Sequence, residues 1–337
     1  MKEYLKALKK EFIKDKYLIL IELIIIALFF IPLNYYIETG GGMKNIGNRV
    51  QIDNSYKEKG SFNIVYVEQL DATIGTYLLS FIIPSWERTK ISSYQYNDEE
   101  TIKDLTIRSK LDLKQVSNAA IYNAYNEANK DISIKSNKII VYATFNDYKT
   151  NLKVGDEILK IDNIKKDKIE EYKEIINSKN INDNIIVTVK RKNKIKDINT
   201  KIYKSKNNEK VLGISLFNDI TYNTNPKVKI KFKHNEEGPS GGLVTALKIY
   251  NLLTKEDITK GKTIAATGTL EDDGKVGEIG GIKYKVIGAK KADIFLVPKE
   301  NYKEAVSVAK KHKLKVKIIS VSTFKDALNK LNKELNN

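Results

Sequence analysis

The sequence predicts a multi-domain α/β (α+β) protein with an N-terminal transmembrane helix, and three observations support this prediction. Residues 17–37, YLILIELIIIALFFIPLNYYI, form an apolar run in which Glu22 is the single charge. Residues 132–203 show the pattern of several short strands around one helix, which is typical of a small β-barrel module. From residue 208 onward, strand and helix patterns alternate, and this alternation favours an α/β domain.

The apolar run contains 21 residues, about the length that crosses a bilayer as a helix. Six lysines precede it, whereas Lys44 and Arg49 are the basic residues over a similar length after it. Positive charge is enriched on the cytoplasmic side of membrane spans. No small-x-small cleavage site follows the run, which disfavours a cleaved signal peptide. We therefore expect a single-pass protein of the cell membrane, with a cytoplasmic basic N-terminus (1–16), an anchor (17–37) and extracytoplasmic C-terminal domains.

The composition excludes several kinds of site. The 337 residues include no cysteine and two histidines, so thiolate chemistry is absent and a multi-histidine metal site is not expected. No motif indicates a cofactor or a metal. Lys+Arg is 59 and Asp+Glu is 42, which gives a net charge of +17. The basic residues are spread over the whole length without an arginine-rich cluster, so no nucleic-acid partner is expected, although an anionic envelope polymer remains an alternative.

The region 44–131 is expected to form an extracytoplasmic N-terminal region. Residues 60–70, GSFNIVYVEQL, read as a strand. From Asn97 to Asn129 the pattern is helical, because apolar residues recur at steps of three and four. This stripe consists of Leu113, Val116, Ala120, Ala124 and Ala128.

The region 132–205 is expected to be a separate small module. Strands are predicted at 138–143, 152–164 (after a Gly-Asp turn), 184–191 and onward to Tyr203, with a short amphipathic helix at 168–178. LKVGDEILKIDN (152–163) resembles the Leu-x-x-Gly-Asp-x-Ile signature of PDZ domains, although the glycine of their carboxylate-binding loop is missing from SNKIIVYA. The resemblance implies a peptide groove between 138–144 and 168–178. The alternative is a PDZ-like spacer that binds nothing.

The region 208–337 alternates strands and helices. Strands are expected at 227–233, 293–298 and 315–321, and helices at 240–254, 283–292, 301–312 and the C-terminus. Residues 262–279 read as a hairpin that turns at Asp272-Asp273-Gly274.

One short stretch of this region carries a candidate nucleophile. EEGPSGGLVTAL (236–247) places Ser240 in a Gly-Pro-Ser-Gly-Gly turn before an apolar helical pattern. A serine at a helix start commonly caps the helix. The same place also suits a nucleophile, because the N–H groups there can stabilise a tetrahedral oxyanion. Gly238, Pro239 and Gly241 form this turn, and backbone N–H groups around 238–240 are the candidate oxyanion donors.

A nucleophilic serine needs a base. His312 lies in the charged run KKHK, and nothing in the sequence marks an orienting acid for His234. The alternative base is a lysine whose pKa is lowered by burial. GEIGGIKYKVIGAKKA (277–292) offers Lys283 and Lys285 directly after a Gly-Gly pair.

GPSGGL followed by TGTLEDDGKVGEIGGIKYK closely resembles the proteolytic domain of Lon peptidases, which use a Ser-Lys dyad. The resemblance implies that Ser240 is the nucleophile, Thr267 the supporting threonine and Lys285, rather than Lys283, the catalytic lysine. Thr267 and Lys285 stand 18 residues apart, which is the family spacing, whereas the 27 residues between Ser240 and Thr267 are about two more than is common. The acidic pair Glu236-Glu237 stands where relatives often carry glycine.

The layout as a whole resembles the membrane-anchored, PDZ-containing Lon-like proteases of Gram-positive bacteria. It implies an anchor, a PDZ-like domain (132–205) and a Lon-like serine protease domain (208–337). It also implies protein or peptide substrates and, by analogy, a hexameric ring. Gly261-Lys262-Thr263 is not a phosphate loop, because position 256 is Glu256 instead of glycine, so we expect peptide-bond hydrolysis without ATP. The rival interpretation is a catalytically silent scaffold that binds client proteins or anionic envelope polymers.

Overall fold

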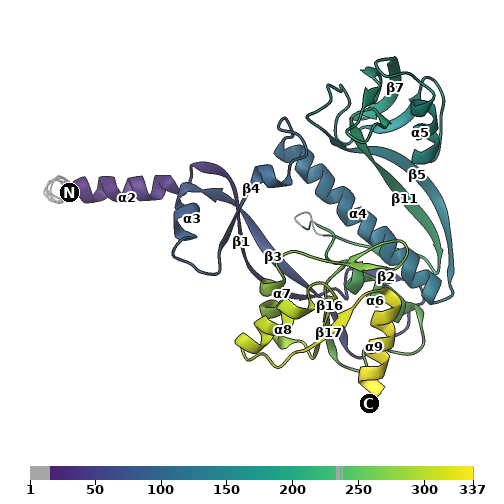
Figure 1. Ribbon diagram of the computed structural model, residues 1–337. Coiled ribbons are helices and arrows are strands. Elements are labelled where there is room, and N and C mark those ends of the chain that lie inside the picture. The colour runs from purple at the N-terminus through teal and green to yellow at the C-terminus, as the bar shows by residue number, and fades with distance from the viewer. Residues whose placement is uncertain (1–15, 233–235, 237, 337) are drawn as a thin grey trace, which may run out of the picture. The chain divides into compact units, whose positions relative to one another are not determined.

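The computed structural model describes residues 16–232, 236 and 238–336. The described residues divide into two compact units, one formed by 16–41 with 67–94 and the other by the described residues of 42–66 with 95–336. Strands β1 (Pro32–Asn45) and β3 (Ser61–Thr73) contribute residues to both units (Figure 1). Each unit is described by itself.

The first unit contains helix α2 (Lys16–Leu28), the start of β1, helix α3 (Ile74–Leu79), strand β4 (Glu87–Lys90) and the 3-10 turn η1 (Ile91–Tyr94). β1 and β4 are antiparallel, with Tyr35 opposite Lys90 and Glu38 opposite Glu87. α3 begins at a capping box in which the side chain of Thr73 accepts from the N–H of Thr76 and the side chain of Thr76 accepts from the N–H of Thr73. The ring of Tyr35 lies 4.9 Å from that of Tyr77, which packs α3 against β1.

The predicted membrane anchor at 17–37 is wrong. α2 has 13 residues and ends at Leu28, and the chain is extended from Pro32 onward. Of the predicted span 17–37, only 17–28 is helical, which is about 18 Å at 1.5 Å per residue, whereas the hydrocarbon core of a bilayer is about 30 Å thick. Proline biases the residue before it toward extended backbone, and Tyr35–Ile37 then pair with β4. None of the helices in the described residues could cross a membrane, which also contradicts the single-pass localisation.

The centre of the second unit is a parallel sheet. The first residues of β3 pair with β13 (Thr263–Ala266), β13 pairs with β16 (Ile294–Pro298), and β16 pairs with β17 (Lys317–Val321). The inner strands β13 and β16 are short and largely apolar, as expected for strands that are covered on both faces. The prediction of a hairpin over 262–279 was therefore only partly right. Its first arm, β13, is a central parallel strand, and the hairpin consists of β14 (Thr269–Leu270) and β15 (Val276–Gly277).

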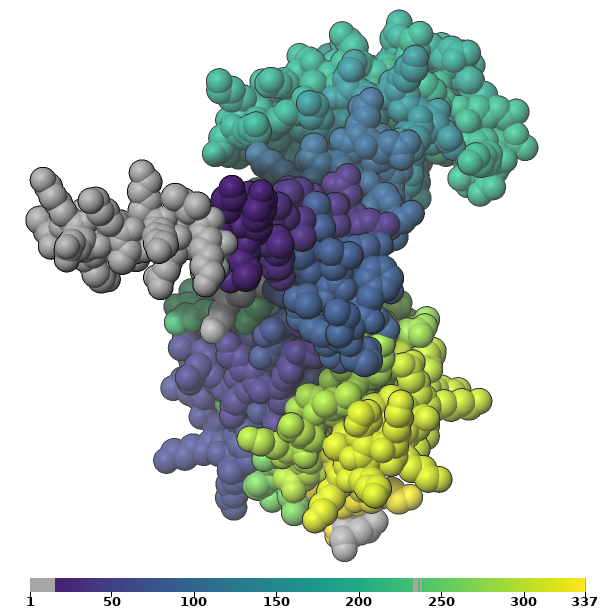
Figure 2. All heavy atoms as spheres, turned by 90° about the vertical axis from the view of Figure 1, so that its left-hand side faces the viewer, coloured from purple at the N-terminus to yellow at the C-terminus, as the bar shows by residue number. Residues whose placement is uncertain are grey.

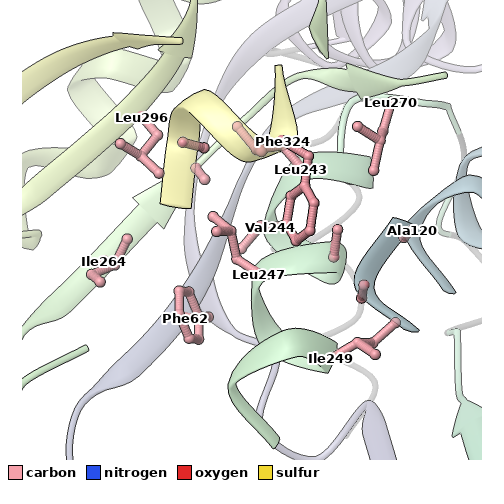
Figure 3. Close-up of a cluster of buried hydrophobic side chains, with 14 of the residues drawn as sticks. Phe62, Ala120, Leu243, Val244, Leu247, Ile249, Ile264, Leu270, Leu296 and Phe324 are labelled. Carbon is pink, nitrogen blue, oxygen red and sulfur yellow. The ribbon is translucent and has the colours of Figure 1, made fainter. Parts of the chain in front are cut away.

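Helices cover both faces of this sheet. Successive strand residues point to opposite sides, so each strand contributes side chains to both covered faces. Phe62, Ile264 and Leu296 face α6 (Gly242–Leu253) and α9 (Phe324–Asn336), and the resulting cluster is drawn in Figure 3. On the other face, Ala265 and Phe295 pack with residues of α7 (Ile282–Gly288), the 3-10 turn η2 (Ala289–Lys291) and α8 (Tyr302–Lys311). The site described below lies where β13 ends and α6 begins.

Helix α4 (Ile102–Glu127) joins the first of these clusters. It begins at Thr101, whose side chain accepts from the N–H of Asp104 in a capping box. Of the predicted apolar stripe, Val116, Ala120 and Ala124 are buried, and they pack toward α6. Two short strands, β2 (Val50–Ile52) and β12 (Val228–Ile230), form a separate antiparallel pair.

The second unit also contains a five-stranded sheet in the order β11-β5-β6-β7-β8. The strands are β5 (Asp131–Thr144), β6 (Glu157–Ile161), β7 (Asn184–Arg191), β8 (Lys194–Lys201) and β11 (Ile214–Asn225). Helix α5 (Ile169–Asn177) packs on this sheet through Tyr172 and Ile176. A further two-residue pair joins β9 (Tyr203–Lys204) to β10 (Lys210–Val211). β5 and β11 are the longest strands of this sheet and run side by side in Figure 1.

The C-terminal helices present polar faces to solvent. In α9 the residues Phe324, Ala327 and Leu331 are buried, whereas Lys325 is exposed and Lys330 is half-buried. Figure 2 shows long side chains projecting from this yellow part of the surface. This half-buried pattern is that of a helix on the outside of a domain.

Candidate active site

Ser240 lies in the loop that leads into α6. The N-cap of α6 is Gly241, so Ser240 precedes the cap and does not occupy the capping position that its sequence context favoured. Its carbonyl oxygen accepts two hydrogen bonds, from the N–H of Gly268 at 2.9 Å and from the hydroxyl of Thr267 at 3.2 Å. These bonds fix the backbone of Ser240 against the end of β13.

Thr267 is fully buried and directly follows β13. Its N–H donates to the carbonyl of Leu296 in the neighbouring strand at 3.1 Å, which anchors the residue to the sheet. Its hydroxyl donates to the carbonyl of Ser240 and lies 3.5 Å from the amine of Lys285, at the long limit of a hydrogen bond. Thr267 therefore contacts both the segment of Ser240 and the side chain of Lys285.

Lys285 lies on α7 and is 5% exposed. Burial lowers the pKa of its amine from 10.5 to about 8, because the charged form loses its hydration. Among the residues that the structure describes, no carboxylate forms an ion pair with it. A large share of this lysine is consequently neutral at mildly alkaline pH, which is the protonation state that a general base requires.

Lys283 differs from Lys285 in its surroundings. It is half-buried, and its ammonium lies 4.7 Å from the centre of the Tyr284 ring. Since α7 is helical from Ile282, residues 283 and 285 point in different directions. Of the two lysines, the hydrogen bond to Thr267 belongs to Lys285.

The turn before α6 offers backbone donors. Gly238 has φ +85°, a conformation that favours glycine, and no atom lies within 4 Å of the position where a side chain would begin. Within the described part of the chain, the N–H groups of Gly238 and Gly241 have no hydrogen-bond acceptor, and Pro239 has no N–H. Free N–H groups next to a partly buried serine are suited to bind a developing oxyanion.

The loop before Ser240 contains an ion pair that the sequence pattern did not indicate. The guanidinium of Arg49 bonds the carboxylate of Glu236, and the carbonyl of Arg49 accepts from the N–H of Lys231 at 2.8 Å. Arg49 and Glu236 are 187 positions apart, so only the fold brings them together. The other two residues discussed for this loop, His234 and Glu237, lie outside the described residues.

The peptide groove that was predicted between 138–144 and 168–178 does not lie at a terminal strand of the sheet. β5 is an inner strand, paired with β11 along its length and with β6 at Ile139 and Ile140. The terminal strands of this sheet are β11, next to β5, and β8 at the other side. Sequence reasoning missed β11 because its partner β5 lies about 80 residues earlier.

Comparisons with known proteins agree with the resemblances of these two regions. Residues 218–333 match the Lon protease (S16) C-terminal proteolytic domain, and residues 132–202 match the PDZ domain. The Lon protease of Campylobacter concisus (strain 13826) is 40% identical over 96 residues, which cover 28% of this chain and 12% of that protein. The Lon protease of Trichlorobacter lovleyi is 34% identical over 95 residues, or 28% and 11% of the two chains.

The chain thus matches only about one eighth of the length of these curated relatives. Among solved structures, the PDZ domain of an SdrC-like protein from Listeria monocytogenes is 25% identical. That match covers 23% of this chain and 85% of the other, with a TM-score of 0.22. The family matches confirm that one region of the chain is similar to a Lon-type proteolytic domain and another to a PDZ domain.

Proposed function

We propose that this chain is a serine endopeptidase in which Ser240 is the nucleophile and Lys285 the general base. The observation that carries the proposal is the environment of Lys285. Its amine is buried, its pKa is lowered to about 8, and it contacts Thr267, whose hydroxyl also bonds the carbonyl of Ser240. The match of residues 218–333 to a proteolytic domain supports the same reaction class.

In this proposal the neutral amine of Lys285 accepts the hydroxyl proton of Ser240 while the serine oxygen attacks the scissile carbonyl. The oxyanion that forms is stabilised by N–H groups of the 238–241 turn. The ammonium of Lys285 then gives the proton to the leaving amine as the C–N bond breaks, which leaves an acyl-enzyme. A water molecule, deprotonated by the same lysine, releases the product acid and restores the serine.

Thr267 has a positioning role in this scheme. A lysine side chain has four rotatable bonds, and holding its amine toward a serine costs conformational entropy. The hydroxyl of Thr267 fixes the amine, and the strand bond from its N–H to Leu296 fixes Thr267. The base is therefore positioned before the substrate binds.

The proposed substrates are unfolded or flexible protein segments, cleaved without ATP. The 337-residue sequence has no phosphate loop, since Gly261-Lys262-Thr263 lacks the preceding glycine. In the structure this stretch leads into the strand β13, whereas a phosphate loop leads into a helix. Nothing in this sequence would then unfold a compact substrate before cleavage.

A second candidate function is a scaffold that binds clients without cutting them. The observation that favours it is the PDZ match at 132–202, whose sheet has a free edge strand, β11. The two functions differ in whether the serine is needed, because a scaffold would work equally well without Ser240 or Lys285.

The test is to incubate the full chain with a permanently unfolded protein, without ATP, and to identify fragments by mass spectrometry. The matched variants are Ser240→Ala, Lys285→Met and, as a control, Lys283→Met. We expect fragments from the wild type and from Lys283→Met, and none from the other two. Cleavage that persists in Ser240→Ala would contradict the proposal, and binding without cleavage in all four proteins would support the scaffold.

A further inference from the structure

A cleft of about 450 Å³ lies in the second unit, between α4 and the sheet that contains β5 and β11. α4 contributes Asp112 and Asn118, and β11 contributes residues 215–218, Ile220 and Tyr222. The amide of Asn118 donates to the carbonyl of Ile220 at 2.5 Å, so α4 is fixed against β11 at one end of the cleft. The volume is within the range of sites that hold a few side chains of a ligand.

The charge of this cleft is opposite to that of the chain. Two aspartates, Asp112 and Asp272, line it, and none of the lining residues in the described part of the chain is a lysine or arginine. The whole chain has 59 basic residues and a net charge of +17. Two cations close to the cleft already have partners: Arg108 pairs with Glu100 at 2.7 Å and also lies 5.7 Å from the centre of the Tyr142 ring, and Lys114 pairs with Asp219.

Asp112 lacks full compensation of its charge. It accepts a hydrogen bond from the hydroxyl of Tyr142 at 2.8 Å. Burial nevertheless raises the pKa of Asp112, and the effect of burial exceeds that of the tyrosine and of Arg108. A second cation brought next to this carboxylate would therefore be bound favourably.

Aromatic rings line the same cleft. Tyr142, Phe217 and Tyr222 contribute to its walls, and the rings of Tyr142 and Phe217 are stacked with their centres 6.4 Å apart. Ring faces attract ammonium and, more often, guanidinium groups. Carboxylates next to aromatic rings are the combination that suits a lysine or arginine side chain.

We propose that this cleft binds an extended polypeptide segment through a lysine or arginine side chain, with the segment lying beside β11 and its basic group between Asp112 and Asp272. The terminal position of β11 supplies main-chain donors and acceptors for an extended ligand. The basic side chain, rather than a chain terminus, decides which segment binds. The proposal extends the proposed function by naming a class of client, but it does not depend on cleavage.

The two aspartates belong to different parts of the second unit. Asp112 lies on α4 beside the PDZ-matching residues, whereas Asp272 lies in the turn between β14 and β15, inside the region that matches the proteolytic domain. β14 follows Thr267 by two residues. A bound segment would therefore contact the proteolytic region directly, close in sequence to its active-site threonine.

The test uses full-length Ser240→Ala, which cannot cleave the probe, and fluorescence anisotropy. The probes are ten-residue unstructured peptides of glycine, serine and alanine with acetyl and amide ends, so that no charged terminus is present. One peptide carries a central arginine and its partner carries citrulline, which has nearly the same shape without the charge. We expect the arginine peptide to bind about tenfold more tightly, although the protein is itself strongly basic.

The added changes Asp112→Asn and Asp272→Asn should together abolish this preference and leave citrulline binding unchanged. Asp147→Asn is the matched control, because Asp147 is an exposed carboxylate that pairs with Lys206 and does not line the cleft. Thermal unfolding checks that each variant is folded. Equal affinity for the two peptides, no binding of either, or a preference that survives the double change would each overturn the proposal. None of these outcomes bears on cleavage by Ser240, which is tested separately.

Discussion

At the scale of single residues, the burial of Lys285, which we propose as the general base, has a cost in stability. A pKa lowered from 10.5 to about 8 means that the folded state disfavours the charged amine by about 3 kcal/mol. The unfolded chain holds this proton up to about pH 10.5, whereas the folded chain releases it near pH 8. The cost is therefore complete below pH 8 and disappears as the pH rises toward 10.5.

Lys285→Met should accordingly make the protein more stable while removing its activity. We expect the free energy of unfolding at pH 7 to rise by about 2–3 kcal/mol, with a smaller gain at pH 10. Denaturant unfolding of the wild type and the variant at both pH values measures this difference. A variant that is less stable than the wild type at pH 7 would contradict the buried position of a charged amine.

Thr267 allows a separate test, because valine has the same shape without the hydroxyl. Thr267→Val removes the hydrogen bonds to the amine of Lys285 and to the carbonyl of Ser240. The carbonyl of Ser240 still accepts a hydrogen bond from the N–H of Gly268. We expect kcat to fall by about tenfold or more with little change in KM. Steady-state kinetics on a short peptide checks the split, and Thr267→Ser, which restores a hydroxyl, should recover part of kcat. An unchanged kcat would remove Thr267 from the mechanism.

The residues proposed for the site come from motifs that are local in the sequence. Ser240, Thr267 and Lys285 stand in short segments with a fixed spacing, and the structure brings these segments together through Thr267. The ion pair between Arg49 and Glu236 was not predictable, because neither residue stands in a pattern and 187 positions separate them.

At the scale of elements, the start of α6 depends on close contact with two neighbours. A methyl group added at Gly242 would lie 2.7 Å from Val116 on α4 and 2.9 Å from Leu270 on β14. Both distances are too short for carbon atoms. The small residue at this position therefore sets how closely α4, α6 and β14 pack, next to Ser240.

Gly242→Ala should destabilise the protein by about 1–3 kcal/mol, although alanine is the better helix former. Gly280→Ala is the matched control, since no atom lies within 4 Å of the added methyl group and its effect should be small. Thermal or denaturant unfolding of both variants gives the comparison. Equal stability of the two variants would show that the helix can shift to accommodate the methyl group.

Elements with a strong local pattern agreed closely with prediction, whereas those defined by distant pairing did not. β7 has the predicted bounds, Asn184–Arg191, because its alternating apolar residues are buried on one face. β1 was missed since its start lies within an apolar run that resembles a long helix. β13 was assigned to a hairpin, yet its partners are β3 and β16, about 200 residues before and 30 after it.

At the scale of the whole molecule, the proposed peptidase carries its catalytic residues in a sequence without a phosphate loop. We therefore expect that adding ATP and Mg²⁺ leaves the rate of cleavage of an unfolded protein unchanged. The same substrate protein in its folded state should be cut only at its flexible segments. Gel-based cleavage assays with folded and unfolded forms measure both effects, and a rate that rises several-fold with ATP would contradict the proposal.

The central claim is that a neutral Lys285 activates Ser240, and the pH dependence of kcat/KM tests it most directly. The probe is a short peptide without ionisable groups, measured from pH 6 to pH 10. Because the base acts only when deprotonated, kcat/KM should rise about tenfold per pH unit at low pH and level off above about pH 8. A profile that is flat over this range, or that falls between pH 7 and pH 9, would contradict a lysine base.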